Sequence, residues 1–123
     1  MTRGVFDLYV ERLVDAALRG AEEKSAIDPV VLDLRRLVDS FDALVIASGG
    51  SDRQVRSITE EVERVVALTT GVRPLRVEGF AEAQWVALDY GDVIVHVFDL
   101  ASRDYYDLEH LWSAVTAFRA PTR

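Results

Sequence analysis

The chain has 123 residues, of which 50% are hydrophobic, so it has the length of one domain and enough apolar material for one core. Its formal net charge of −7 argues against direct binding to naked nucleic acid, because neutralising phosphates requires clustered Lys and Arg, and it favours a basic partner protein. The sequence contains no cysteine, which excludes disulfides, thiol nucleophiles and cysteine-ligated metals.

Targeting and membrane segments are not evident in the sequence. No apolar stretch approaches the roughly 20 residues that cross a bilayer, and the first residues lack the apolar region of a signal peptide. We therefore expect one cytoplasmic domain over residues 1–123, with residues 113–123 as a loose tail and with no membrane contact.

The N-terminal third predicts a helix followed by a strand. Apolar residues recur at helical spacing over residues 6–23, with charged residues on the other side. We expect Gly20 and the charged residues 22–25 to loosen and end this helix. The apolar run over residues 27–34 predicts a strand, whose start Pro29 places at an edge or at a strand beginning.

A buried strand and a capped helix follow. The continuous apolar run within residues 41–48 is typical of a strand buried on both faces, so we place it at the centre of the sheet. It leads into a glycine turn with side-chain oxygens that can cap a helix, formed by Gly49, Gly50, Ser51 and Asp52. From Arg53 the apolar residues follow a helical period, and Gly71 supplies the stop.

Residues 73–79 predict a short strand, and residues 84–98 predict a β-hairpin that turns at residues 90–92. Because strand side chains alternate between faces, Val86 and Leu88 are expected to face the core. This leaves Trp85, Asp89 and, at the end of the run, Tyr90 near a surface.

The final element predicted is a short helix within residues 102–112, where aromatic and leucine residues fall at helical spacing. The expected order is thus helix, two strands, helix, three strands and helix. This order predicts an α/β or α+β fold with a mixed, mostly five-stranded sheet and helices packed on it.

Several blocks in this order resemble one family. Residues 42–55, which read Asp-Ala-Leu-Val-Ile-Ala-Ser-Gly-Gly-Ser-Asp-Arg-Gln-Val, are followed by Arg-Val-Glu-Gly at 76–79, by the hairpin and by Tyr-Asp-Leu-Glu-His-Leu-Trp at 106–112. Together they resemble the ribosomal silencing factor family, also called Iojap-like or YbeB-like. Ordered blocks are far more specific than a single motif.

The resemblance implies a non-enzymatic protein, homodimeric when free, with a nucleotidyltransferase-like topology. It implies binding to the large ribosomal subunit through ribosomal protein number fourteen of that subunit. A body held there would block joining of the small subunit and lower translation under nutrient limitation. The resemblance also favours a partner-binding role for the exposed end of the hairpin, which comprises Trp85, Asp89, Tyr90 and Asp92.

The sequence leaves two alternative functions open. The Gly49-Gly50-Ser51 turn resembles that of nucleotidyltransferases, but it lacks the Lys of a Walker loop, and Asp89 and Asp92 lie at opposite ends of a turn instead of alternating on one strand face. A capped structural helix, without metal, cofactor or catalytic residues, is therefore preferred to a nucleotide site. A plain dimeric scaffold is the third possibility.

Histidine chemistry is also not favoured. His96 lies in the second strand of the hairpin, and His110 is the only other histidine in the sequence. A catalytic or metal-binding histidine needs converging partners, and no third ligand is evident. We therefore expect His96 to be a hydrogen-bonded structural residue.

Overall fold

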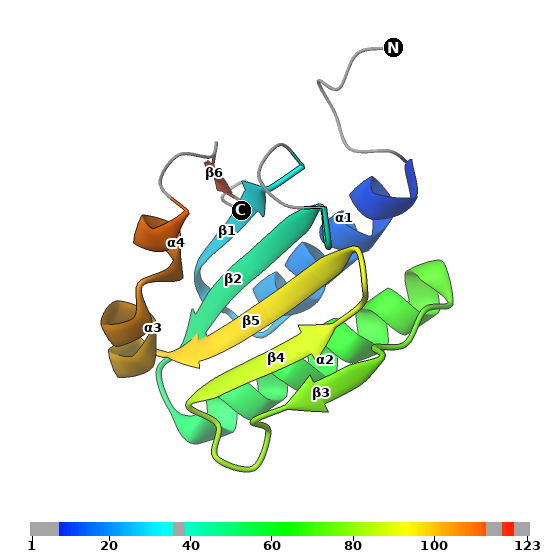
Figure 1. Cartoon of the computed structure of the whole chain (residues 1–123). Coiled ribbons are helices and arrows are strands. Elements are labelled where there is room, and N and C mark those ends of the chain that lie inside the picture. Colours follow the sequence, from blue (N-terminus) through cyan, green and yellow to red (C-terminus); the bar gives the residue numbers. More distant parts are fainter. Residues whose placement is uncertain (1–7, 36–38, 113–116, 120–123) are drawn as a thin grey trace.

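The computed structural model describes residues 8–35, 39–112 and 117–119 (Figure 1). Two long helices, α1 and α2, cover one face of a mixed β-sheet, and two short helices, α3 and α4, lie beside the other face. The helices are α1 (Leu8–Glu23), α2 (Asp52–Thr70), α3 (Leu100–Tyr106) and α4 (Leu108–Leu111). The strands are β1 (Ile27–Asp33), β2 (Ala43–Gly49), β3 (Arg76–Glu78), β4 (Trp85–Asp89), β5 (Val93–Asp99) and β6 (Ala117–Arg119).

The strand order across the sheet is β3-β4-β5-β2-β1-β6, with β2 and β5 parallel and every other neighbouring pair antiparallel. The predicted mixed α/β fold and its five strands are confirmed. Strand β6 adds a sixth strand, which pairs with β1 inside the segment predicted as a loose tail. The rest of that segment lies outside the described residues. Strand β2 is buried along its whole length, as predicted for a central strand.

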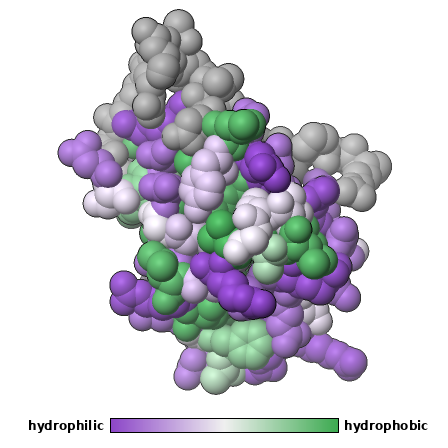
Figure 2. All heavy atoms as spheres, turned by 90° about the vertical axis from the view of Figure 1, so that its right-hand side faces the viewer, coloured by the Kyte–Doolittle hydropathy of each residue, from purple (hydrophilic) through white to green (hydrophobic). Residues whose placement is uncertain are grey.

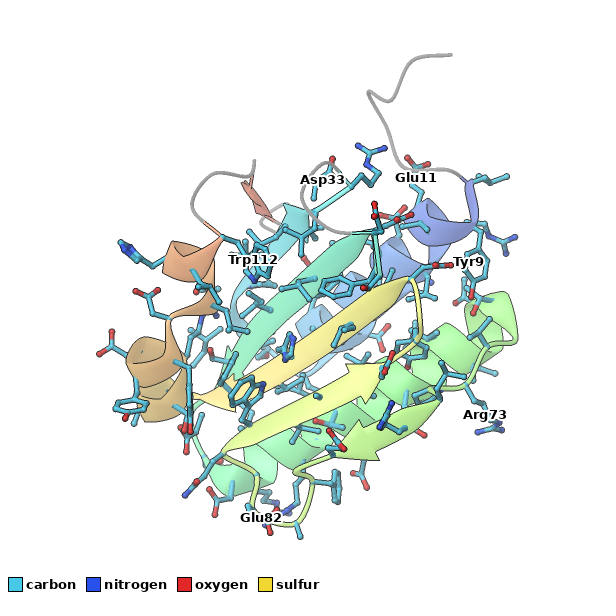
Figure 3. All side chains as sticks on the ribbon, viewed as in Figure 1. Tyr9, Glu11, Asp33, Arg73, Glu82 and Trp112 are labelled. Carbon is cyan, nitrogen blue, oxygen red and sulfur yellow. The ribbon has the colours of Figure 1, made fainter. Side chains whose placement is uncertain are left out.

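The sheet has an apolar cluster on each face. On the side of α1 and α2 the cluster includes Val86 and Leu88, both fully buried, so their predicted orientation toward the core is confirmed. On the other face a smaller cluster gathers around Phe98 and Leu44. Trp112 packs against this second cluster from the end of α4 (Figure 3). Because α3 and α4 lie toward β1 and β2, they leave the β3 and β4 side of this face open (Figure 1).

The prediction that Gly20 loosens the first helix is wrong, because α1 continues through it to Glu23. A Cβ atom at Gly20 would lie 2.7 Å from the Cα of Val62 in α2. Glycine therefore serves the close approach of two helix backbones here, which outweighs its low helix propensity. Helix α2 ends as predicted, at Gly71 in the left-handed conformation with φ 76°.

The single helix predicted over residues 102–112 is also wrong, because Asp107 divides this segment into α3 and α4. Asp107 has φ 47°, ends α3 in the left-handed conformation, and accepts a hydrogen bond from the backbone N–H of His110 to begin α4. Asp tolerates this conformation better than most residues, since its side chain bonds to the nearby backbone. Helix α3 begins after Asp99, which caps the N–H of Ser102 at 2.7 Å.

Hydrophobic residues on the side of the molecule drawn in Figure 2 form separate patches among hydrophilic ones. No helix in the described part of the chain has the length and apolar character that crossing a membrane requires.

Candidate functional site: the open face of β4 and β5

The predicted hairpin is confirmed, with β4 and β5 antiparallel and joined through Gly91, which has φ 89°. On the face away from α1 and α2, Trp85 pairs with Phe98 and Asp89 pairs with Ile94. We call the surface over these strands the open face. An open pocket of about 480 Å³ lies on it, lined by Arg76, Glu78, Gly79, Trp85, Ala87, Asp89, Ile94 and His96.

Trp85 is half-buried and is held on several sides. Its ring stacks on Phe98 with 5.1 Å between centroids and lies 4.5 Å from the ring of Tyr106 in α3. Its indole N–H donates to Nδ1 of His96 at 2.8 Å. Trp85 therefore packs against neighbouring rings and also lines the pocket on the open face.

His96 is the predicted hydrogen-bonded histidine, and this prediction is confirmed. Because the indole N–H can only donate, Nδ1 must accept, and the neutral ring carries its proton on Nε2. Burial lowers the pKa of His96 to about 4, since the charged form loses its hydration. His110 lies apart on α4. No group of three or more His, Asp or Glu side chains in the described residues is arranged to hold a metal ion.

Asp89 and Asp92 lie on either side of the hairpin turn, as predicted. The carboxylate of Asp89 accepts from the N–H of Gly91 at 2.8 Å and lies 3.8 Å from the guanidinium of Arg76. Asp92 is exposed, and its backbone carbonyl accepts from the N–H of Asp42 at 2.7 Å. The turn is thus fixed to the start of β2, while the Asp92 carboxylate lies at the surface.

The expectation that Tyr90 lies near a surface is wrong. It is 4% exposed and belongs to the core beneath α1 and α2. The physical reason is strand alternation, which puts Tyr90 on the face of Val86 and Leu88. Its hydroxyl is buried and has no hydrogen-bond partner among the described residues. Burial raises the pKa of Tyr90 well above its usual value, and Glu63 adds to the shift.

The glycine turn before α2 is engaged within the protein. Gln54 accepts from the N–H of Gly50 at 2.6 Å, and Ser51 accepts from the N–H of Gln54 at 3.1 Å. The same Gln54 side chain donates to the carbonyls of Lys24 and Ser25 at 3.1 Å.

This turn is also closely packed. A Cβ at Gly49 would lie 2.9 Å from the backbone nitrogen of Val55. The cap predicted at Ser51 is confirmed. Asp52 is the first helical residue, and its carboxylate stabilises the helix by interacting with the positive end of the helix dipole. The N–H groups of Gly50, Gln54 and Val55 are thus already bonded within the protein, which favours the structural interpretation.

Arg103 connects α3 to the sheet where β1 begins and β2 ends, and the sequence did not indicate this role. Its guanidinium makes two hydrogen bonds of 3.1 Å to the carboxylate of Glu109. It also donates to the Ser48 hydroxyl at 3.0 Å and to the Ile27 carbonyl at 3.1 Å. Arg103 therefore ties α3 and α4 to β1 and β2, and it sets the position of Tyr106 beside Trp85. No spacing in the sequence indicates this role, because its partners are up to 76 positions away.

The fold and sequence match known proteins over most of the chain. The family model described as "Ribosomal silencing factor during starvation" matches residues 8–122. Among the curated relatives named ribosomal silencing factor RsfS are two that cover most of this chain. The one from Bacillus subtilis is 39% identical, over 81% of this chain and 84% of its own length. The one from Halalkalibacterium halodurans is 37% identical, over 83% and 86%. A crystal structure of a Chromobacterium violaceum protein superposes with a TM-score of 0.80 and 34% identity, covering 92% of this chain and 90% of that one.

Proposed function

The chain belongs to the ribosomal silencing factor family, as its sequence blocks predicted, and on this premise we propose how it silences translation. It binds the large ribosomal subunit through ribosomal protein number fourteen of that subunit. Its folded body then occupies space that the small subunit requires, so translation falls under nutrient limitation. The mechanism is steric and needs no catalytic residue.

The open face carries this proposal, because it presents a pre-formed anchor. Trp85 is held by Phe98, Tyr106 and the hydrogen bond to His96. A ring that is already held loses little conformational freedom on binding, and tryptophan offers a large rigid contact area with a polar group. The pocket of about 480 Å³ beside it gives a partner side chain a place to enter.

Charge supports a basic partner at the same surface. Asp92 is exposed at the turn, and Asp89 lines the pocket. With a net charge of −7 for the chain, these carboxylates favour encounter with a basic ribosomal protein and orient it on arrival. We assign the contacts to Trp85, Asp89 and Asp92, and we give Tyr90 the role of supporting the turn from the core side.

A nucleotidyltransferase-like function has no comparable support. The turn from Gly49 to Asp52 is bonded through Gln54, and no group of three or more His, Asp or Glu side chains in the described residues is arranged to hold a metal ion. We therefore propose a regulatory factor, acting in the cytoplasm, instead of an enzyme.

The free protein is proposed to be a homodimer. Strand β3 offers an edge with all three residues exposed, and exposed backbone edges pair readily with a second strand. The apolar residues of α1 that remain exposed, Leu8 and Tyr9, offer an alternative surface. Sedimentation equilibrium at micromolar concentration distinguishes a dimer from a monomer, and a strictly monomeric species would reject this part of the proposal.

Co-sedimentation with purified ribosomal subunits tests the central proposal. The protein is expected to pellet with large subunits, and large subunits carrying it are expected to form fewer joined ribosomes when small subunits are added. Small subunits alone are the control. Failure to pellet with large subunits overturns the proposal, and so does pelleting without any effect on subunit joining.

A further inference from the structure

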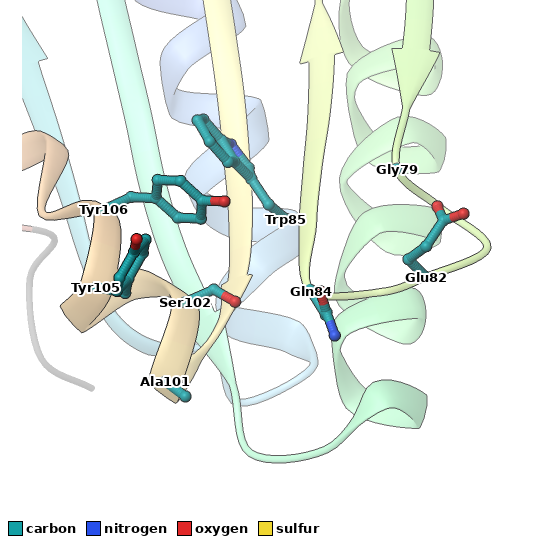
Figure 4. A pocket seen from close by; sticks show the side chains of 8 residues that line it. All are labelled: Gly79, Glu82, Gln84, Trp85, Ala101, Ser102, Tyr105 and Tyr106. Carbon is teal, nitrogen blue, oxygen red and sulfur yellow. The ribbon is translucent and has the colours of Figure 1, made fainter.

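A second pocket lies at the start of β4, next to α3, and shares only Trp85 and Gly79 with the pocket on the open face (Figure 4). We call it the aromatic pocket. It has a volume of about 330 Å³ and is lined by Gly79, Glu82, Gln84, Trp85, Ala101, Ser102, Tyr105 and Tyr106. Its lining contains three aromatic rings and one carboxylate, and no basic side chain among the described residues.

The aromatic wall is formed by Trp85 and the two tyrosines of α3. The rings of Trp85 and Tyr106 are 4.5 Å apart, and those of Tyr105 and Tyr106 meet edge to face at 5.0 Å. Tyr105 is nevertheless 81% exposed and Tyr106 is 49% exposed. In Figure 4 the two tyrosines lie on one side of the pocket with Trp85 beside them. The rings are thus ordered by each other while much of their surface stays available to a ligand.

The opposite wall is the loop that carries Glu82 and Gln84, and it is fixed to the body of the protein. Arg56 donates to the carbonyls of Phe80 and Ala81 at 3.2 and 2.7 Å. Within the loop, the N–H of Ala83 donates to the carbonyl of Gly79 at 3.0 Å. Both Glu82 and Gln84 are exposed, so their oxygen atoms remain accessible beside the pocket.

We infer that the aromatic pocket binds an arginine side chain of a basic partner protein. A guanidinium is planar and weakly hydrated, so it stacks on aromatic rings while its N–H groups donate to a carboxylate and an amide oxygen. Trp85 and Tyr105 supply the rings, and Glu82 and Gln84 supply the acceptors. Lysine fits less well, because its ammonium is a strongly hydrated point charge without a flat face.

The negative charge of the pocket and of the whole chain disfavours binding of a nucleic-acid strand. A strand that stacked its bases on the tyrosines would bring phosphates toward the Glu82 carboxylate, in a protein whose net charge is already −7. The identity of the partner as a ribosomal protein rests on the proposed function, whereas the preference for arginine rests on the pocket alone.

The test titrates the full-length protein with acetyl-arginine amide and, separately, with acetyl-lysine amide. The readouts are the NMR signals of the Trp85 indole N–H and of the Gln84 side-chain amide. Arginine is expected to shift both signals saturably, and more tightly than lysine. Tyr105→Leu removes a cation–π contact, and Glu82→Gln removes the carboxylate that pairs with the guanidinium. Each change should weaken arginine binding about three- to fivefold, which is the size of an exposed cation–π contact. Tyr105→Phe keeps the ring and should bind like wild type.

Exposed Glu60 on α2 supplies the matched charge control, because it does not line the pocket and Glu60→Gln removes the same charge. The inference is overturned if arginine produces no saturable shift, if lysine binds equally well, or if Glu60→Gln weakens binding as much as Glu82→Gln. It is also overturned if a short RNA displaces the arginine derivative from the pocket.

Large-subunit co-sedimentation of the same variants separates this inference from the proposed function. Tyr105→Leu is expected to lower affinity for large subunits by a similar three- to fivefold factor, about what one exposed cation–π contact contributes. Arginine binding with no large-subunit binding, even for the wild type, rejects the proposed function and leaves the pocket's specificity in place. Unchanged subunit affinity for Tyr105→Leu overturns the assignment of this pocket to the partner.

Discussion

The indole nitrogen of Trp85 and the imidazole Nδ1 of His96 are joined by a hydrogen bond of 2.8 Å across two antiparallel strands. This bond fixes the orientation of the indole and, at the same time, fixes the tautomer of the histidine. The proposed anchor of the open face is therefore connected to a buried titratable group. Changes at either residue test different aspects of the same arrangement.

Replacing Trp85 by Ala should weaken binding to the isolated large-subunit protein number fourteen by about 2 kcal/mol or more, because large aromatic anchors dominate interface energies. Trp85→Phe keeps a ring on Phe98 and Tyr106 but removes the indole N–H, so a smaller loss is expected. Isothermal calorimetry with folded variants gives both values. Unchanged affinity for a folded Trp85→Ala protein would remove Trp85 from the interface.

The lowered pKa of His96 predicts that the stability of the protein depends on pH. Its pKa of about 4 in the folded protein lies below the ordinary value of 6.5, so the unfolded chain binds more protons between these values. Its contribution to stability is complete above pH 6.5 and is lost as the pH falls toward 4. The free energy of unfolding should therefore fall by on the order of 3 kcal/mol over this pH range. Urea unfolding at a series of pH values measures this change.

Two controls isolate this effect. His96→Gln should flatten the dependence between pH 6.5 and 4, whereas His110→Gln, at an exposed histidine, should leave it unchanged. Glu61 overlaps this range only below pH 4.5, because the hydrogen bond from Arg64 lowers its pKa from 4.5 to about 2 and its contribution is lost between these values. A wild-type stability that stays constant from pH 6.5 to 4 would contradict a buried neutral His96.

Periodic patterns explain why much of the fold was predictable. The buried strand β2, the capped helix α2 and the hairpin each follow from local residue order, since alternation, helical spacing and a glycine turn act over a few positions. The apolar faces of the hairpin also follow, because Val86 and Leu88 alternate with Trp85. Fold class and core orientation are thus encoded locally.

The missed features depend on contacts between distant segments. Glycine at position 20 is unfavourable in an isolated helix, and only the packing of α2 against it explains its place. In the same way, Arg103 is an ordinary helix residue until the fold brings Ser48 and Glu109 to it. Tyr90 is a different case, because strand alternation places it on the core face with Val86 and Leu88 although it borders the turn. Trp85 was identified as a candidate from the sequence, while its bond to His96 required the strand register.

Gly20→Ala should destabilise the protein even though alanine favours helices. The new Cβ would lie 2.7 Å from the Cα of Val62 and 2.9 Å from the carbonyl oxygen of Glu61, and backbone atoms cannot move aside separately. Overpacking of this kind costs about 1–3 kcal/mol, beyond the gain in propensity. Chemical denaturation measures the change. Gly50→Ala is the control, since a Cβ atom there would have as its nearest neighbour the flexible Gln54 side chain, at 3.4 Å. Equal losses of stability for the two variants would contradict the packing explanation.

Tyr90→Phe removes a buried hydroxyl that has no hydrogen-bond partner in the described residues. An unsatisfied buried polar group is unfavourable, so the free energy of unfolding should stay the same or rise by about 1 kcal/mol. Affinity for large subunits should not change, because the ring supports the turn from within the core. A stability loss above about 1 kcal/mol would indicate that the hydroxyl has a partner in the protein.

Arg103→Lys tests whether planar, two-pronged bonding places α3. Lysine keeps the charge but cannot bond both oxygens of Glu109 while reaching Ser48 and the Ile27 carbonyl, so a loss of about 2 kcal/mol in unfolding free energy is expected. Because α3 carries Tyr106, the near-ultraviolet circular dichroism of Trp85 should change as well. Arg53→Lys, at an exposed position of α2, should alter stability by less than about 0.5 kcal/mol. Equal behaviour of the two variants would show that charge alone suffices at Arg103.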